Sequence, residues 1–252
     1  MPLTQKNTFK NRLLAGFSHD DLGRFFAELE FVSLPCKQII YEAGGRIEHV
    51  YFLEDGVASL LTRMADGATI EVGMIGREGM VGIAALLGAE VSAQRIIIQV
   101  AATAHRIGVA RCRAAFDGSA VLRREMLGYS DVLFNLSAQT AACNSLHSVE
   151  RRCARWLLIS SDRIRSDSVP ITHEFLSSML GVRRVGVTTT LGKLERSGLV
   201  RSERGRLTII DRPALEGAAC ECYRIDRLRF ERLHCGSGGP DAQTETGELS
   251  PR

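Results

Sequence analysis

The stretch ITHEFLSSMLGVRRVGVTTTLGKLERSGLVRSERGRLTII, residues 171–210, constrains the fold more than any other part of the chain. Thr172 is a helix-capping residue, and the apolar side chains after it recur at the spacing of one helix face. Gly181 supplies the turn that often joins the two helices of a helix-turn-helix unit. The pattern predicts a short helix that ends near Gly181 and a second helix over about 182–197.

The second predicted helix has two faces of different character. Val187, Leu191 and Leu194 recur every three to four residues, and we expect them to pack on the first helix. The opposite face is basic and polar near its N-terminal end, where a recognition helix reads base edges in the major groove. Two short strands, 199–201 and 206–210, follow around a turn at 203–205. The predicted DNA-binding residues are Arg183, Arg184, Val185, Thr188, Thr189, Lys193, Arg201 and Arg204.

Positive charge is concentrated in this region. Residues 183–206 hold seven basic and two acidic side chains, a net charge of +5, whereas the whole chain carries +3. Such a patch attracts phosphates through counterion release. The alternative is a solvated basic face on an ordinary helical subdomain. The turn, the two helices, the hairpin and the positive charge together favour double-stranded DNA as the partner.

Composition excludes several other classes of protein. No run of 18 apolar residues is present, so we expect no membrane span. The N-terminal residues lack a secretory pattern, and the seven cysteines are scattered, which is typical of reduced thiols in a cytoplasmic protein. The polar, Gly- and Pro-rich segment 235–252 is predicted to be a disordered tail.

The N-terminal half has a different pattern of apolar residues. Short apolar runs alternate with turn residues over about 29–109, including Asp55-Gly56 and Asp66-Gly67, dipeptides that favour hairpins. Many short strands of this kind predict a sandwich or barrel. The predicted organisation is α+β: a β-barrel domain with N-terminal helices at 1–116, a long helix at 117–148, and a winged helix-turn-helix domain at 149–234.

The long predicted helix carries an apolar repeat with alternating spacings of four and three residues. Such a repeat is typical of a helix packed lengthwise on a partner. We predict that it forms a homodimer interface, and the alternative is a helix packed only on its own barrel. The repeat consists of Leu122, Met126, Tyr129, Leu133, Leu136, Thr140 and Cys143.

The order of these parts resembles the Crp/Fnr family of bacterial transcription regulators. The stretches 41–60 (YEAGGRIEHVYFLEDGVASL), 74–88 (MIGREGMVGIAALLG) and 150–158 (ERRCARWLL), with the helix-turn-helix region, carry the resemblance. It implies a sensor barrel of the double-stranded β-helix or jelly-roll type similar to a cyclic-nucleotide domain. It also implies a long dimerisation helix, a winged helix on a palindromic operator, and RNA polymerase as a further partner.

The resemblance also indicates where an effector would bind. Members that bind cyclic AMP carry Gly-Glu-x-Gly, whose Glu contacts the ribose, and a downstream Arg-Ser pair for the cyclic phosphate. The predicted effector pocket here is Gly76, Arg77, Glu78, Gly79, Gln94 and Arg95, in which Arg77 replaces that Glu. A guanidinium donates hydrogen bonds and accepts none, so cyclic AMP in its usual mode is disfavoured. Arg77 and Arg95 could instead bind another anion. The alternative is a pocket that is filled by side chains and binds no ligand.

Other chemistry has little support in the sequence. The resemblance implies an iron–sulfur cluster only in members with clustered N-terminal cysteines, and Cys36 alone lies there. Cys220-x-Cys222 with His234-Cys235 departs from the usual zinc spacings, so we expect free thiols and no metal or other cofactor. No phosphate-binding loop, dinucleotide fingerprint or nucleophile elbow is present, so an enzyme is not expected.

The sequence therefore predicts a homodimeric, sequence-specific DNA-binding transcription regulator. Two rival interpretations stay open at this stage. One is a small-molecule-binding signalling protein whose winged helix contacts protein, and the other is a barrel enzyme with an accessory DNA domain.

Overall fold

The computed structural model describes residues 9–17 and 19–234. Two short helices, α1 (Arg12–Ala15) and α2 (His19–Ala27), come first, in agreement with the predicted N-terminal helices. Eight strands then form the sensor part, with a 3-10 helix η1 (Ile83–Ala85) after the sixth. They are β1 (Glu30–Leu34), β2 (Ile39–Tyr41), β3 (His49–Leu53), β4 (Val57–Arg63), β5 (Thr69–Ile75), β6 (Met80–Val81), β7 (Arg95–Val100) and β8 (Ala102–Gly108).

The eight strands form two antiparallel sheets. One has the order β1-β8-β3-β6 and the other β2-β7-β4-β5. Apolar side chains from both sheets, such as Leu53 and Ile98, share one buried cluster. No pairing between named strands joins the two sheets in the described part of the chain, so the predicted barrel is an open, two-sheet structure here.

The two Asp-Gly dipeptides play different roles. Gly67 lies in a true hairpin, because β4 pairs directly with β5. Gly56 instead connects β3 in one sheet to β4 in the other, which corrects the hairpin expectation for that position. Its φ is +68°, and a Cβ there would come within 2.5 Å of Ala101 O and of the Ala102 side chain, so glycine is required where the two connections between sheets meet.

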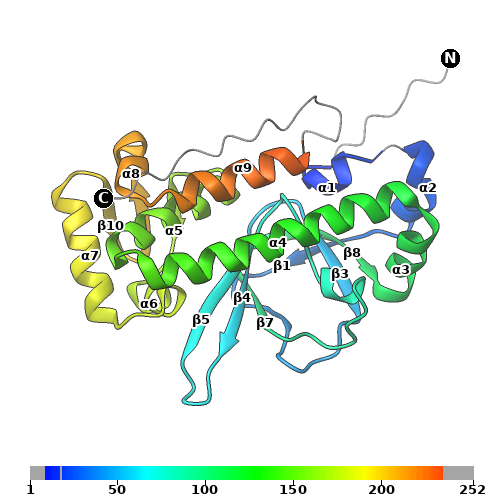
Figure 1. The fold of residues 1–252 in the computed structure, drawn as a ribbon, viewed down its shortest axis with the longest axis horizontal. Helices are drawn as coiled ribbons and strands as arrows, with labels where there is room; N and C mark the ends of the chain where they lie inside the picture. Colours follow the sequence, from blue (N-terminus) through cyan, green and yellow to red (C-terminus); the bar gives the residue numbers. More distant parts are fainter. Residues whose placement is uncertain (1–8, 18, 235–252) are drawn as a thin grey trace, which may run out of the picture.

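Helices link the sensor sheets to the C-terminal part. They are α3 (Val109–Gly118), α4 (Ala120–Leu146) and α5 (Val149–Ile164). Ser119 caps α4 by accepting a hydrogen bond from the Leu122 N–H at 3.2 Å. Figure 1 shows α4 running along most of the length of the molecule, in front of the sheets.

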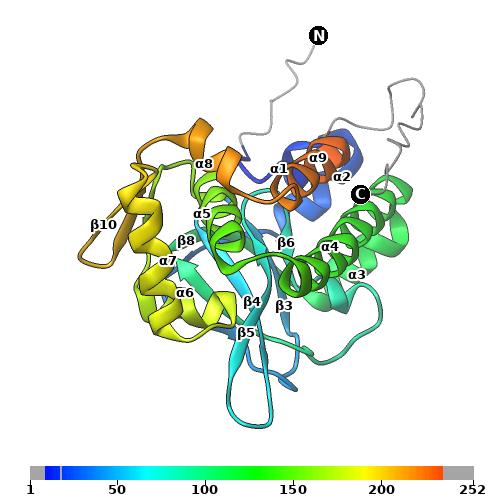
Figure 2. The same ribbon diagram turned by 60° about the vertical axis from the view of Figure 1, so that its left-hand side comes forward.

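The C-terminal part contains a small sheet and four helices in the described residues. The elements are β9 (Ser168–Pro170), α6 (His173–Leu180), α7 (Arg184–Arg196), β10 (Val200–Glu203), β11 (Arg206–Ile209), α8 (Arg212–Ala218) and α9 (Cys222–His234). Figure 2 shows α6, α7 and β10 gathered at one side of the molecule, while α9 lies apart from them, near α1 and α4. The predicted winged helix is confirmed, and α9 is an addition to it.

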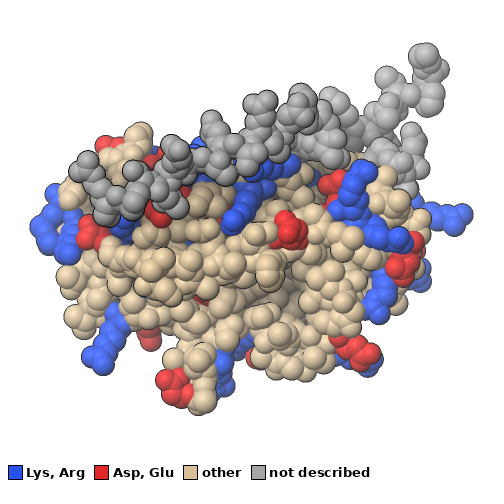
Figure 3. All heavy atoms as spheres, viewed as in Figure 1, with Lys and Arg blue, Asp and Glu red and all other residues tan. Residues whose placement is uncertain are grey.

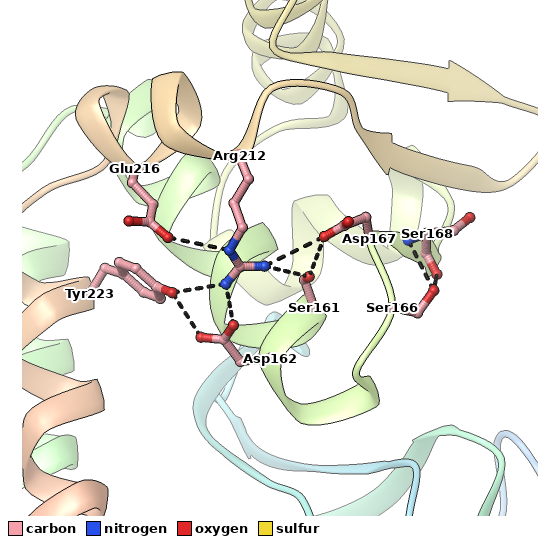
Figure 4. A network of polar contacts seen from close by, with 8 residues as sticks. All are labelled: Ser161, Asp162, Ser166, Asp167, Ser168, Arg212, Glu216 and Tyr223. Carbon is pink, nitrogen blue, oxygen red and sulfur yellow. Dashed lines mark hydrogen bonds and ion pairs between the residues drawn. The ribbon is translucent and has the colours of Figure 1, made fainter.

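Polar contacts tie α8 and α9 to α5. Arg212, at the start of α8, pairs with Asp162 of α5 and donates to the Tyr223 hydroxyl of α9 at 3.0 Å. It also donates to Ser161 Oγ at 3.0 Å. Figure 4 shows these groups converging on one guanidinium. One planar side chain thus fixes three helices against each other.

The heptad repeat of α4 faces its own protomer. Leu122, Met126, Tyr129 and Cys143 are at most 1% exposed, and Leu133 and Leu136 pack against the same core as Met126. Thr140 is half-buried and accepts a hydrogen bond from Arg155 at 3.1 Å. In this structure the repeat packs against α3, α9 and the sensor sheet of its own protomer, and its role as the homodimer interface stays a prediction.

Candidate nucleic-acid interface

The helix cap and the glycine turn that the sequence predicts are present around α6. Thr172 Oγ1 accepts a hydrogen bond from the Phe175 N–H at 3.2 Å and so caps α6. Gly181 ends α6 with a φ of +62°, in the left-handed region that favours glycine. A Cβ at this position would come within 2.7 Å of Ile70 in β5, so Gly181 also allows the turn to lie against the sensor sheet.

The recognition helix α7 divides its residues as predicted. Val187, Leu191 and Leu194 are at most 1% exposed and pack into the core of the winged helix. The first two turns present an outward face that contains basic, hydroxyl and apolar groups. All five residues predicted there are exposed: Arg183, Arg184, Val185, Thr188 and Thr189. Val185 is 76% exposed, so its methyl groups are available at the surface of the helix.

His173 holds this face in place, a role that the sequence analysis missed. Its Nδ1 lies 3.2 Å from Thr188 Oγ1 on α7, and its Nε2 lies 3.2 Å from Ser202 Oγ on β10. One imidazole therefore connects the recognition helix with the adjoining hairpin. The only signal in the sequence is the position of His173 directly after the cap of α6, which does not reveal either partner.

The hairpin of β10 and β11 forms the predicted wing. Glu195 Oε1 of α7 accepts a hydrogen bond from the Ser202 N–H at 2.6 Å and fixes the wing to the recognition helix. Arg201 and Arg204 are exposed on or beside the turn of the wing. Lys193 is also exposed, and its ammonium lies 3.4 Å from Glu150 Oε2 at the start of α5. The predicted basic residues thus lie on α7 and on the hairpin that is hydrogen-bonded to it.

A second exposed surface follows α4 itself. Leu127, Phe134 and Leu146 are 46%, 74% and 80% exposed, and the small residues Ala138 and Ala141 are exposed as well. Residues 127, 134, 138 and 141 are spaced by seven, four and three, the spacing of one helix face. Figure 3, which looks onto the α4 side of the molecule, shows few charged side chains along its middle.

The predicted effector-pocket residues divide between two places. Gly79 packs against Tyr129 of α4 so closely that a Cβ would meet the hydroxyl oxygen at 2.2 Å. Glu78 Oε1 accepts the Gly76 N–H at 2.9 Å and pairs with Arg163 of α5 at 2.6 Å. This segment therefore joins the sensor sheets to α4 and α5 and leaves little room for a ligand next to Gly79.

Arg77 and Arg95 do not share a site in the described structure, contrary to expectation. Arg95 pairs with Glu42 at 3.3 Å, beside the half-buried Gln94. Arg77 lines a cavity of about 230 Å³ between its own loop, α5 and α9. Burial and the neighbouring Arg165 and Arg12 lower the pKa of the Arg77 guanidinium. The cavity is lined by Arg12, Arg77, Glu78, Ile159, Asp162, Arg163, Tyr223, Asp226, Arg227, Phe230 and Glu231.

A smaller cavity of about 90 Å³ lies between β5, α4 and α5 and contains a buried carboxyl group. The Trp156 Nε1–H donates to Glu71 Oε1 at 2.8 Å, and Glu71 Oε2 has no hydrogen-bond partner. Burial raises the pKa of Glu71 to about 7. Glu71 thus lies where β5 of the sensor sheet meets Trp156 of α5.

Two family models match the two halves of this architecture. The cyclic nucleotide-binding domain matches residues 31–117, and the Crp-like helix-turn-helix domain matches residues 151–218. Together they cover the sensor sheets and the recognition helix. The chain belongs to the Crp/Fnr family of transcription regulators.

Solved structures of Crp/Fnr regulators share this fold. A Crp/Fnr regulator from Eubacterium rectale superposes with a TM-score of 0.66 at 18% identity, over 82% of this chain and 96% of its own. FixK2 from Bradyrhizobium japonicum gives 0.66 at 14% identity, over 76% and 98%. The CRP-family regulator TTHB099 from Thermus thermophilus gives 0.65 at 21% identity, over 76% and 99%. No curated protein sequence matches this chain.

Parts of this Crp/Fnr regulator lie outside both family models. The helix-turn-helix match ends at residue 218, so the segment with Cys220, Cys222 and all of α9 follows it. Of the sequence pair His234-Cys235, Cys235 lies outside the described residues. Among the helices that the structure describes, none combines the length and the apolar character of a membrane span.

Proposed function

We propose that this regulator binds double-stranded DNA as a homodimer and recognises a palindromic operator through α7. The single observation that carries the proposal is the exposed face of Arg184, Val185, Thr188 and Thr189 on a helix whose opposite side is buried. Such a face fits the major groove, where arginine pairs with guanine and methyl groups pack on thymine. The Crp-like helix-turn-helix match supports the same interpretation.

The individual residues have different roles in this proposal. Arg184 reads a base edge, and Arg183 and Lys193 contact phosphates. Arg201 and Arg204 on or near the wing contact the backbone beside the groove. Because phosphate contacts position a protein and base contacts specify a sequence, Arg184 sets one operator position while the others set affinity.

The homodimer forms, in this proposal, through the exposed apolar residues of α4. Two copies related by a two-fold axis would bring Phe134 and Leu127 of one protomer against the same helix of the other. The small residues Ala138 and Ala141 permit a close approach of two helices. A two-fold protein also matches a two-fold operator, which places one α7 in each half-site.

The effector in this proposal is a small molecule other than cyclic AMP in its usual mode. Arg77 offers a donor at the position where the cyclic-AMP-binding members carry an acceptor for the ribose hydroxyl, and it lines a cavity that holds both arginines and carboxylates. RNA polymerase is the further partner that membership of the family supports.

Selection from a pool of random double-stranded DNA with the purified full-length protein tests this function. We expect enrichment of a two-fold symmetric sequence whose half-sites are one helical turn apart, about 10 base pairs. A signalling protein whose winged helix contacts protein would enrich no sequence. Binding to all DNA alike, without an enriched motif, would also contradict sequence-specific recognition.

A further inference from the structure

The end of α4 and the start of α9 bring together a set of soft ligands that are far apart in the sequence. Cys143 lies in the last turn of α4, and His147 follows that helix. Cys220 lies between α8 and α9, and Cys222 is the first residue of α9. Their four potential ligand atoms all lie within 4.8 Å of one another. The three thiols are at most 2% exposed.

The spacing fits a tetrahedral metal ion. Cys143 Sγ lies 3.5 Å from Cys220 Sγ, and Cys222 Sγ lies 3.7 Å from His147 Nδ1. With zinc–sulfur bonds of about 2.3 Å and zinc–nitrogen bonds of about 2.0 Å, neighbouring ligands of a tetrahedral zinc ion are separated by roughly 3.5–3.8 Å. These two separations match this geometry, and small side-chain shifts would bring the other ligand atoms, which all lie within 4.8 Å of one another, to the same spacing.

Neighbouring residues orient His147 and Cys222 so that their ligand atoms can bind a metal ion. His147 Nε2 lies 3.1 Å from Glu221 Oε1, an arrangement in which the Nε2–H donates and the lone pair of Nδ1 faces the sulfur atoms. Gln139 Nε2 donates to Cys222 Sγ at 3.1 Å. A carboxylate behind a metal-binding histidine and a donor to a ligand sulfur are common features of protein zinc sites.

The charges around the cluster suit thiolates. Three thiolates and one neutral imidazole around a divalent ion leave a net charge of −1, which is costly in a buried place unless a cation is near. Arg152 and Arg155 of α5 both interact electrostatically with Cys143. Arg152 Nε has no hydrogen-bond partner. These two guanidinium groups can balance the negative charge of the site.

We propose that Cys143, His147, Cys220 and Cys222 form a closed, tetrahedral site for Zn²⁺. Four protein ligands leave no open position, so the ion is structural rather than catalytic. It links the C-terminal end of α4 to the N-terminal end of α9. The ion thus fixes the helix that we assign to dimerisation against the segment that follows the DNA-binding domain. Metal binding itself does not depend on the proposed DNA function.

The test measures zinc in full-length protein prepared without a metal-affinity tag and kept reduced. The variants are Cys222→Ser and, as a matched control, Cys36→Ser, because Cys36 is exposed and lies outside the cluster. We expect about one zinc ion per chain in the wild type and the control, and at least about a tenfold loss in Cys222→Ser. Equal zinc in all three proteins, or none in the wild type, would overturn the proposal.

A second measurement covers the case in which Cys222→Ser does not fold. Wild-type protein stripped by a chelator is titrated with cobalt(II), which gives intense visible absorption only in a tetrahedral thiolate site. We expect that spectrum, and its disappearance when zinc is added. Iron with acid-labile sulfide in place of zinc, or a Cys143–Cys220 disulfide in the reduced preparation, would contradict the assignment.

Discussion

Arg163 Nε lies 2.6 Å from Glu78 Oε1, and this ion pair joins the loop after β5 to the last turn of α5. The two side chains are only 9% and 10% exposed, respectively. The sensor part and the DNA-binding part of the chain thus share a charged contact that is shielded from water. The position that the resemblance assigns to an effector pocket serves here as a connection between domains.

Replacing one partner of this pair should destabilise the fold strongly. Arg163→Met leaves the Glu78 carboxylate buried without its cation, and the expected loss in the free energy of unfolding is about 3–5 kcal/mol. Urea unfolding followed by circular dichroism measures it. The double variant Arg163→Met/Glu78→Gln should recover most of the loss, because neither charge remains. A loss below about 1 kcal/mol for Arg163→Met would show that the pair behaves like an exposed one.

Phe134→Glu should convert the dimer into a folded monomer. Phe134 is 74% exposed in the protomer, so the change leaves the fold intact, while pairing through α4 would bury the new charge. Light scattering after size exclusion measures the mass. Leu87→Glu is the control, because Leu87 is a 55% exposed apolar residue outside α4. Leu133→Glu should instead lower stability, since Leu133 packs in its own protomer. A dimeric Phe134→Glu would exclude this surface.

Arg184→Ala and Lys193→Ala should affect DNA binding in different ways. Arg184→Ala should cost about 1–3 kcal/mol on the selected operator and relax the preference at one position. Lys193→Ala should weaken binding to specific and random DNA alike and reduce the salt slope by about 1. Fluorescence anisotropy at several salt concentrations separates the two. An even loss for all sequences in Arg184→Ala would mean that Arg184 contacts only phosphate.

Glu71 should make stability depend on pH. Burial raises its pKa from 4.5 to about 7, so the folded protein holds this proton more tightly than the unfolded chain does. The protonated Glu71 side chain therefore contributes fully to the free energy of unfolding below about pH 4.5, and this contribution is lost as the pH rises through about 7. Glu71→Gln keeps an acceptor for the Trp156 Nε1–H and removes the titration.

We expect Glu71→Gln to gain stability relative to the wild type between pH 5 and pH 8, by an amount on the order of 2–3 kcal/mol. Denaturant unfolding of both proteins across this range provides the comparison. Parallel pH profiles would show that Glu71 does not titrate in this interval.

Cyclic AMP should bind weakly or not at all. Arg77 offers donors where an acceptor is needed, Gly79 is packed against Tyr129, and Arg95 is paired with Glu42. Calorimetry on ligand-stripped protein decides the question. Micromolar binding, roughly −8 kcal/mol, would refute this account of the pocket.

The sequence alone determined the recognition helix and its surroundings. The faces of α7, the cap at Thr172 and the turn at Gly181 follow from local periodicity and backbone preference, which need no distant partner. The family and the order of its domains follow from motifs that each lie within one short stretch. For the same reason, Arg183, Arg184, Val185, Thr188 and Thr189 could be assigned to one exposed face.

Only the tertiary structure decided which surfaces meet. The heptad repeat of α4 shows that the helix has a lengthwise partner, but α9 and the sensor sheet of the same protomer produce that pattern as well as a second copy does. Cys143 and Cys220 are 77 residues apart, and no spacing rule links them. Side chains from distant segments become neighbours only when the chain is folded, because the apolar packing of α4, α5 and α9 brings them together.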